Sequence, residues 1–165
     1  MNKYISLILI AIFSVACNNS NGNQKQKIER KHEEIKKFSP TEIKKLTDKG
    51  FKIIEFIDPK TKDTILMQQY FMAFLKKGKN REQSKQTADS LQRLHLAHLK
   101  KMYDSGYADI SGPFGDLGDI SGVTIYNVPT IEMADSLANS DPSVKAGRLE
   151  IEMHPWWAGK GYSLR

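Results

Sequence analysis

The chain has 165 residues, of which 39% are hydrophobic and 27% charged, and its formal net charge is +6. This length and balance favour one globular domain with additional segments at its ends. Although the net charge is basic, acidic residues are interspersed with the lysines, and no arginine cluster or nucleic-acid-binding motif stands out. The sequence therefore argues against a nucleic-acid partner, and we interpret the charge as a solvated surface near a membrane.

Residues 1–17 have the pattern of a bacterial lipoprotein signal peptide. A short positive start is followed by an apolar run from Tyr4 to Ala16, which is too short to cross a bilayer as a stable helix. The run ends in small residues directly before Cys17, the single cysteine of the chain. We expect Cys17 to be lipidated and to hold the protein in the bacterial cell envelope, facing the periplasm. A free or buried thiol, or an uncleaved N-terminal anchor, is the alternative.

Two segments lead from Cys17 to the main domain. Residues 18–38 are polar and of low complexity at their start, which predicts a flexible tether. Residues 39–63 predict a short helix and a strand, because Ser39 and Glu42 have the spacing of a capping box and the segment after the helix is rich in β-forming residues.

Residues 64–157 follow the order strand–helix–strand–strand–helix–strand, which is typical of the ferredoxin-like split βαβ fold, an α+β class. A loose tail at residues 158–165 follows. The expected elements are a strand at 64–75, a helix at 82–105, a strand at 107–111, a glycine-rich loop at 112–119, a strand at 120–128, a helix from Pro129-Thr130, a single turn at 140–147 and a strand at 149–153.

Both expected helices have an apolar side that should pack on the sheet. In the long helix these positions are Leu91, Leu94, His95, His98 and Met102. In the second helix they are Ile131, Ala134, Leu137 and Ala138. Two helices cover only one face of a four-stranded antiparallel sheet, yet the central strands are apolar on both faces. We therefore predict a homodimer in which the two sheets pack against each other.

From about residue 69 to residue 157 the chain resembles the YCII-related family of the dimeric α/β-barrel superfamily. The matching segments, in order, are residues 70–75, 95–99, 111–114, 138–147 and 152–156. The resemblance implies a sheet-to-sheet dimer and a histidine–aspartate pair that has been proposed as catalytic. By position, the pair here is His95 and Asp141. Ser111 and His98 depart from the residues usual at their positions, and both could change what fits beside the pair.

Each member of this pair also has a purely structural interpretation. His95 could be a satisfied core or interface histidine, and Asp141, just before Pro142, is well placed to cap a helix. As a pair, Asp141 would bind one imidazole nitrogen and fix the tautomer, while His95 would move a proton near neutral pH. Gly112, Pro113 and Phe114 would then shape one wall of a binding pocket between helix and sheet.

Two further possibilities are weaker. His95 and His98 have metal-ligand spacing, and Asp141 could complete a ligand set, but no further ligand supports it, so we expect neither metal nor cofactor. No nucleophile motif is visible. The sequence thus favours an enzyme that performs acid–base chemistry on a small molecule, with a non-catalytic small-molecule-binding or assembly module of the cell envelope as the alternative.

Overall fold

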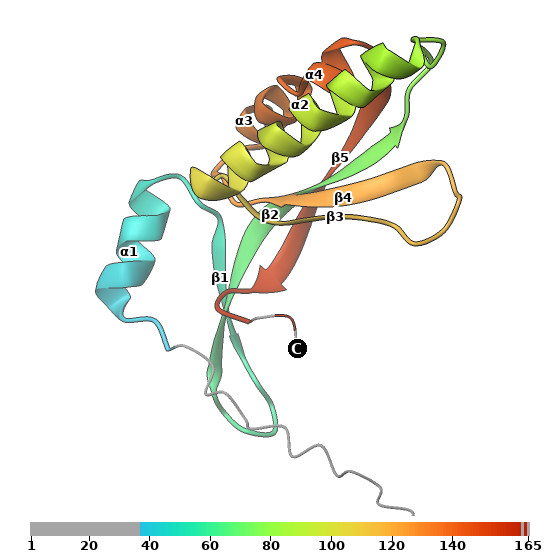
Figure 1. The fold of residues 1–165 in the computed structure, drawn as a ribbon. Helices are drawn as coiled ribbons and strands as arrows, with labels where there is room; N and C mark the ends of the chain where they lie inside the picture. The colour runs from blue at the N-terminus through green and yellow to red at the C-terminus, as the bar shows by residue number, and fades with distance from the viewer. Residues whose placement is uncertain (1–36, 163, 165) are drawn as a thin grey trace, which may run out of the picture. The chain divides into compact units, whose positions relative to one another are not determined.

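The computed structural model describes residues 37–162 and 164, and the predicted signal peptide with Cys17 lies outside these residues. The described part is an α+β fold in which helices lie against an antiparallel sheet (Figure 1). The elements are α1 (Pro40–Asp48), β1 (Ile53–Ile57), β2 (Thr64–Lys77), α2 (Lys85–Asp104), β3 (Ala108–Pro113), β4 (Ile120–Tyr126), α3 (Ile131–Asn139), α4 (Pro142–Lys145) and β5 (Leu149–Gly159).

The sheet has the strand order expected for a split βαβ fold. β2 lies between β5 and β4, and β3 pairs with the outer edge of β4, all antiparallel. The ferredoxin-like prediction is therefore confirmed. β1 adds a fifth strand, because it pairs with the first part of β2 (Ile57 opposite Thr64, Ile53 opposite Gln68) on the edge that β4 uses further along. The β1–β2 hairpin extends beyond the helices (Figure 1).

The helices α2, α3 and α4 cover one face of the sheet and enclose the core (Figure 1). The predicted inward positions Met102, Ala134 and Ala138 are at most 2% exposed, as expected. The prediction that Leu94 and Ile131 face inward was wrong, because Leu94 is 49% exposed and Ile131 is 37% exposed. In α2 the buried stripe is narrow and passes through His95 and Met102, so a neighbouring residue, turned by about 100°, points away from the sheet.

In α3 the place expected for Ile131 is taken by Met133, which packs against the core. The helix begins as predicted, since the Thr130 side chain accepts a hydrogen bond from the backbone N–H of Met133 at 3.2 Å. α1 also begins as predicted, because Ser39 and Glu42 form the capping box in both directions. Local cap chemistry thus sets where helices start, while packing decides which side is buried.

Several boundaries differ from the prediction, and three of these differences have a clear physical reason. α2 starts at Lys85 rather than residue 82, because the Ser84 side chain caps it. Gly112 and Pro113 belong to β3 instead of a loop, and Gly122 opposite them has no room for a Cβ, which would lie 2.6 Å from the Gly112 carbonyl oxygen. β5 continues to Gly159, so the first residues of the predicted tail are in the sheet, held by pairing with β2.

Candidate active site

His95 and Asp141 lie together under the helix layer. His95 is in the middle of α2 and Asp141 is the N-cap of α4, and the distance from His95 Nδ1 to Asp141 Oδ2 is 2.6 Å. Both side chains are nearly inaccessible, at 10% and 4% exposed. An ionised carboxylate can only accept, so His95 Nδ1 carries the proton that it donates to Asp141. Nε2 is then the ring nitrogen that remains for another partner.

Asp141 performs both roles that the sequence left open. Its Oδ1 caps α4 by accepting a hydrogen bond from the backbone N–H of Ser143 at 2.7 Å, while Oδ2 faces His95. Burial alone would raise the pKa of Asp141, but the hydrogen bond and charge of His95, together with the Ser143 N–H, lower it below its usual value. Asp141 is therefore ionised at neutral pH, and neither oxygen is free to turn away.

Ser143 fixes the position of α4 on α2. Its hydroxyl donates to the carbonyl of Leu91 at 3.1 Å, and Leu91 lies one helical turn before His95. Because the side chain is 2% exposed, water does not compete for this bond. Sequence reasoning missed Ser143; its place two residues after an aspartate cap identifies the backbone bond but gives no sign of the contact with α2.

His95 forms part of the wall of a cavity of about 390 Å³ between α2 and the strands β3 and β4. Its Nε2 makes no hydrogen bond within the described residues and is not sealed from solvent. Gly112 and Pro113 line the cavity, but Phe114 does not, and it is 43% exposed. The hairpin pairing continues through Phe114, so its side chain points to the opposite face from Pro113.

The cavity wall combines polar and apolar groups. On the strand side, the Thr124 hydroxyl donates to the Ser111 hydroxyl at 3.0 Å. At another part of the wall lie Arg81 and Arg148, which sequence reasoning also missed. Such a mixture, with a few polar groups on an apolar lining, is typical of small-molecule sites.

His98 does not join the pair. It is half-buried, and its Nε2 is buried without a hydrogen-bond partner among the described residues. Burial lowers the pKa of His98, an effect only partly offset by the charge of Asp141 and a hydrogen bond to the backbone of Leu137. His98 is therefore neutral near pH 7. Within residues 37–162 and 164, no group of three or more His, Cys, Asp or Glu side chains is arranged to hold a metal ion.

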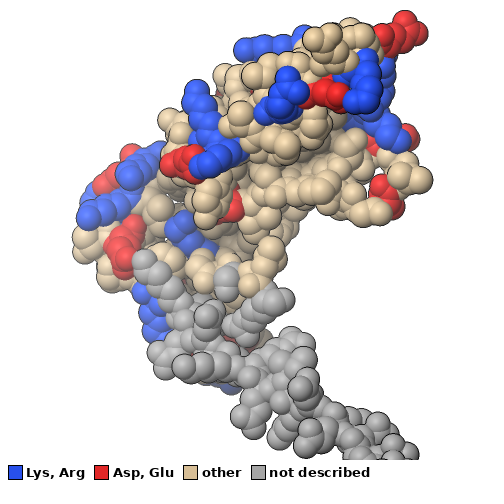
Figure 2. Space-filling view, viewed as in Figure 1, with Lys and Arg blue, Asp and Glu red and all other residues tan. Residues whose placement is uncertain are grey.

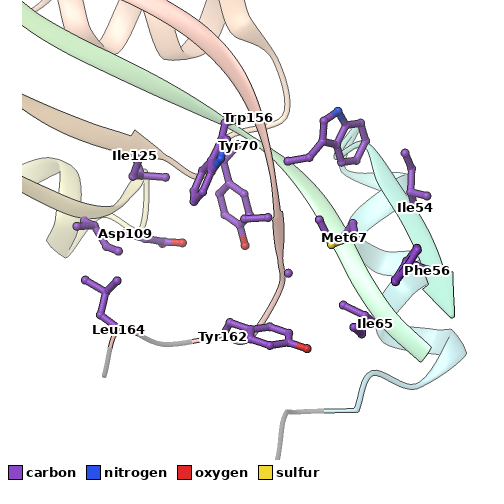
Figure 3. A pocket seen from close by; sticks show the side chains of 14 residues that line it. Ile54, Phe56, Ile65, Met67, Tyr70, Asp109, Ile125, Trp156, Tyr162 and Leu164 are labelled. Carbon is purple, nitrogen blue, oxygen red and sulfur yellow. The ribbon is translucent and has the colours of Figure 1, made fainter. Parts of the chain in front are cut away.

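A second, larger hollow of about 1060 Å³ surrounds the end of β5. We call it the apolar hollow. Figure 3 shows its wall formed by side chains from β1, β2, β4 and β5 and from the segment after β5, among them Phe56, Met67, Tyr70, Ile125, Trp156 and Tyr162. The rings of Tyr70 and Trp156 lie side by side, with centroids 6.3 Å apart. Burial, with the charge of Asp109, raises the pKa of Tyr70 to about 12, so its hydroxyl is neutral.

The charged side chains are distributed differently. Figure 2 shows Lys, Arg, Asp and Glu gathered mainly over the helices, with a largely uncharged surface between α2 and the strands below it. In the part of the chain that the structure describes, no helix is both long enough and apolar enough to span a bilayer.

Comparisons with known proteins identify the family of this chain. No curated protein matches the chain significantly. Among solved structures, it is similar to 5-chloro-2-hydroxyhydroquinone dehydrochlorinase from Burkholderia phenoliruptrix in complex with 2,5-dihydroxybenzoquinone, with 23% identity and a TM-score of 0.41 over 53% of this chain and 92% of that one. The family model of the YCII-related domain matches residues 71–156, which is more than half of the chain. The chain therefore belongs to the YCII-related family.

Proposed function

We propose that this domain is an enzyme that performs acid–base chemistry on a small molecule, with His95 as the proton carrier and Asp141 as the residue that orients it. One observation carries the proposal: a buried, ionised carboxylate holds Nδ1 of His95 at 2.6 Å, while Nε2 of the same ring remains open to a cavity. A proton carrier needs this arrangement, with one ring nitrogen held and the other accessible to a bound molecule.

The arrangement suits a proton transfer that is later reversed. Nε2 would accept a proton from a carbon or hydroxyl of the substrate, and the imidazolium formed would be stabilised by the carboxylate of Asp141. Because Ser143 holds the second oxygen of Asp141, the carboxylate keeps its position through the cycle. The imidazolium would then return the proton to the product or to a leaving group.

Hydrogen–deuterium exchange tests this proposal across many candidate substrates at once. A panel of small carbonyl compounds and phenols in D2O is incubated with the protein, and loss of the activated C–H signals is followed by ¹H NMR. We expect catalysed exchange for at least one compound, loss of that catalysis in His95→Gln, and a reduction of about a hundredfold or more in Asp141→Asn.

The matched control is His154→Gln. His154 is an exposed histidine that contacts Glu152 at 2.9 Å, away from the cavity, so this variant should exchange as the wild type does. Exchange that persists in His95→Gln would contradict the proposal. Binding of the panel without exchange in any variant would favour the alternative, a non-catalytic binding module.

We further propose that two copies of the chain associate through the open face of the sheet. Large apolar side chains there are partly exposed, including Trp156 at 42% and Ile110 at 41%. Their register places Ile110 beside Ile125 and Trp156 beside Tyr70, on the face opposite the helices. Contiguous apolar surface of this kind favours a protein–protein contact.

The membrane anchor is also a proposal, and it rests on the sequence pattern around Cys17. In a bacterial host, the wild-type chain should be recovered with the membrane fraction, and Cys17→Ala should release it into the soluble fraction of the envelope. Retention of Cys17→Ala in the membrane would contradict lipidation as the anchor.

A further inference from the structure

Two arginines line one part of the cavity, and His95 lines another part of the same cavity. Arg81 precedes α2 and Arg148 precedes β5, and Arg81 Nη1 donates to the backbone carbonyl of Arg148 at 3.1 Å. Arg148 Nη1 in turn donates to the Gln83 side chain at 3.0 Å. We call this pair the arginine corner. Each guanidinium uses only one of its several N–H donors in these bonds, so others remain for a ligand.

The arginine corner is held by backbone contacts between the segments that carry it. The N–H groups of Gly78 and Asn80 donate to the carbonyls of Arg148 and Gly147 at 3.0 and 2.9 Å. The two segments approach so closely that a Cβ at position 78 would lie 2.2 Å from the Gly147 carbonyl oxygen. Both guanidinium groups therefore extend from a backbone whose position is fixed before any ligand binds, which lowers the entropic cost of binding.

The positive charge at this corner has no compensating carboxylate. No Asp or Glu among the described residues lines the cavity, and neither arginine forms an ion pair with a carboxylate of that part of the chain. By contrast, surface lysines of α1 and α2 pair with aspartates one turn away, for example Lys85 with Asp89. Asp141, the carboxylate beside His95, is engaged by His95 and Ser143. The corner thus favours an anionic group, and a planar guanidinium fork matches a carboxylate.

The rest of the wall indicates what carries the anion. Leu75, Leu96 and Leu99 provide an apolar lining beside the polar groups. The arginine corner lies near the start of α2, and His95 lies further along the same helix, by ~15 Å of helix axis at the usual rise per residue. Both arginines and His95 line the same cavity, so a molecule that extends along it could reach both.

We infer that the substrate of this cavity is a small organic anion, whose carboxylate binds the arginine corner while its apolar body extends along α2 toward His95. That the bound anion is a substrate rests on the proposed function, whereas the anion site itself does not depend on catalysis.

Benzoate and its neutral isostere benzamide test the inference. Binding of each to the full chain is followed by ¹H–¹⁵N NMR titration of backbone amides. We expect benzoate to shift amides around residues 78–83 and 146–149, and benzamide to bind at least about tenfold more weakly. Arg81→Gln and Arg148→Gln should each weaken benzoate by about tenfold, since a charge-assisted hydrogen bond is lost. Arg148→Lys keeps the charge and should retain part of the affinity.

Arg93→Gln is the matched control, because Arg93 is an exposed arginine of α2 that does not line the cavity. It removes the same charge and should leave benzoate affinity unchanged. Equal binding of benzoate and benzamide, or equal weakening by Arg93→Gln, would overturn the inference. Arg81 is exposed, so Arg81→Gln remains informative if Arg148→Gln fails to fold.

Failure of the inference and failure of the proposed function give different results. If benzoate binds His95→Gln as tightly as the wild type, the anion site stands even where no compound undergoes exchange. If neutral compounds exchange through His95 while benzoate shows no preference over benzamide, the acid–base function stands and the anion site is overturned.

Discussion

The two faces of the sheet differ in what they leave accessible, although they share the same strands. Tyr70 and Phe71 are neighbours on β2, yet Phe71 packs in the core under the helices and Tyr70 lines the apolar hollow. On the helix side, accessible space is a small cavity with a histidine, two arginines and hydroxyl groups. Around the end of β5, it is a larger hollow with aromatic and aliphatic walls.

We infer from this difference that the two faces have separate functions, with chemistry under the helices and association on the open face. Alternation of side chains along a strand lets one strand supply a core on one side and a separate surface on the other. A buried carboxylate and imidazole need fixed partners, which the helices provide, whereas an apolar surface needs only a second apolar surface. We therefore expect the proposed chemistry and the proposed association to respond to different substitutions.

The largest effect should follow a charge placed on the open face. Trp156→Glu would bury a carboxylate in the proposed dimer contact, at a cost of about 3 kcal/mol, which weakens association by about a hundredfold. Sedimentation of the purified protein should show a dimer for the wild type and a monomer for the variant. Leu94→Glu, at a residue 49% exposed on α2, is the control and should remain dimeric. A wild type that sediments as a monomer would contradict the dimer.

An effect of similar size is expected from breaking the buried pair. Asp141→Ala leaves His95 without its partner and α4 without its cap, and should lower the free energy of unfolding by about 3 kcal/mol without abolishing the fold. Asp89→Ala is a geometric match, because the Lys85–Asp89 distance is also 2.6 Å, but that pair is exposed and should cost about 0.5 kcal/mol or less. Urea unfolding measures both, and equal losses would show that burial of the pair is unimportant.

The close approach that supports the arginine corner gives the next effect. Gly78→Ala forces a Cβ toward the Gly147 carbonyl and should destabilise the fold by about 2 kcal/mol, with weaker benzoate binding. Gly112→Ala is the control for stability, because its Cβ would meet no atom within 4 Å. Both variants should sediment as the wild type does. A Gly78→Ala protein as stable as Gly112→Ala would show that the two segments separate readily.

The smallest effect is a pH dependence. The pKa of Asp141 is lowered in the folded state despite its burial, chiefly by His95. Its contribution to stability is therefore present above the ordinary carboxyl pKa and is lost as pH falls through the lower folded value. The stability difference between the wild type and Asp141→Asn should shrink as the pH is lowered below about 4. A difference that stays constant would contradict the lowered pKa.

Local chemistry predicted much of the fold. Helix starts at Ser39 and Thr130 follow from side chains that satisfy backbone N–H groups within one turn, so a short window of sequence is enough. The exposure of Leu94 and Ile131 could not be predicted in this way, since it depends on how each helix is rotated against the sheet. The length of β5 likewise depends on its partner β2.

In the candidate site, too, some features follow from local sequence and others depend on packing. His95 and Asp141 were identifiable from motifs, but their contact depends on α4 packing against α2, through a bond from Ser143 that no local pattern indicates. The arginine corner was missed because Arg81 and Arg148 meet only through the pairing of distant segments. The prediction that Phe114 lines the cavity was wrong. The strand continues past Ser111, and alternation along it directs the Phe114 side chain to the other face.

The tautomer of His95 shows whether Asp141 orients the imidazole. The imidazole ¹⁵N resonances are recorded at a mildly alkaline pH for the wild type and Asp141→Asn. If Asp141 orients His95, the wild type carries its proton on Nδ1 and leaves Nε2 unprotonated, and the Asp141→Asn variant loses that preference. A proton on Nε2 in the wild type, or a tautomer that is unchanged in the variant, would contradict the proposed pair.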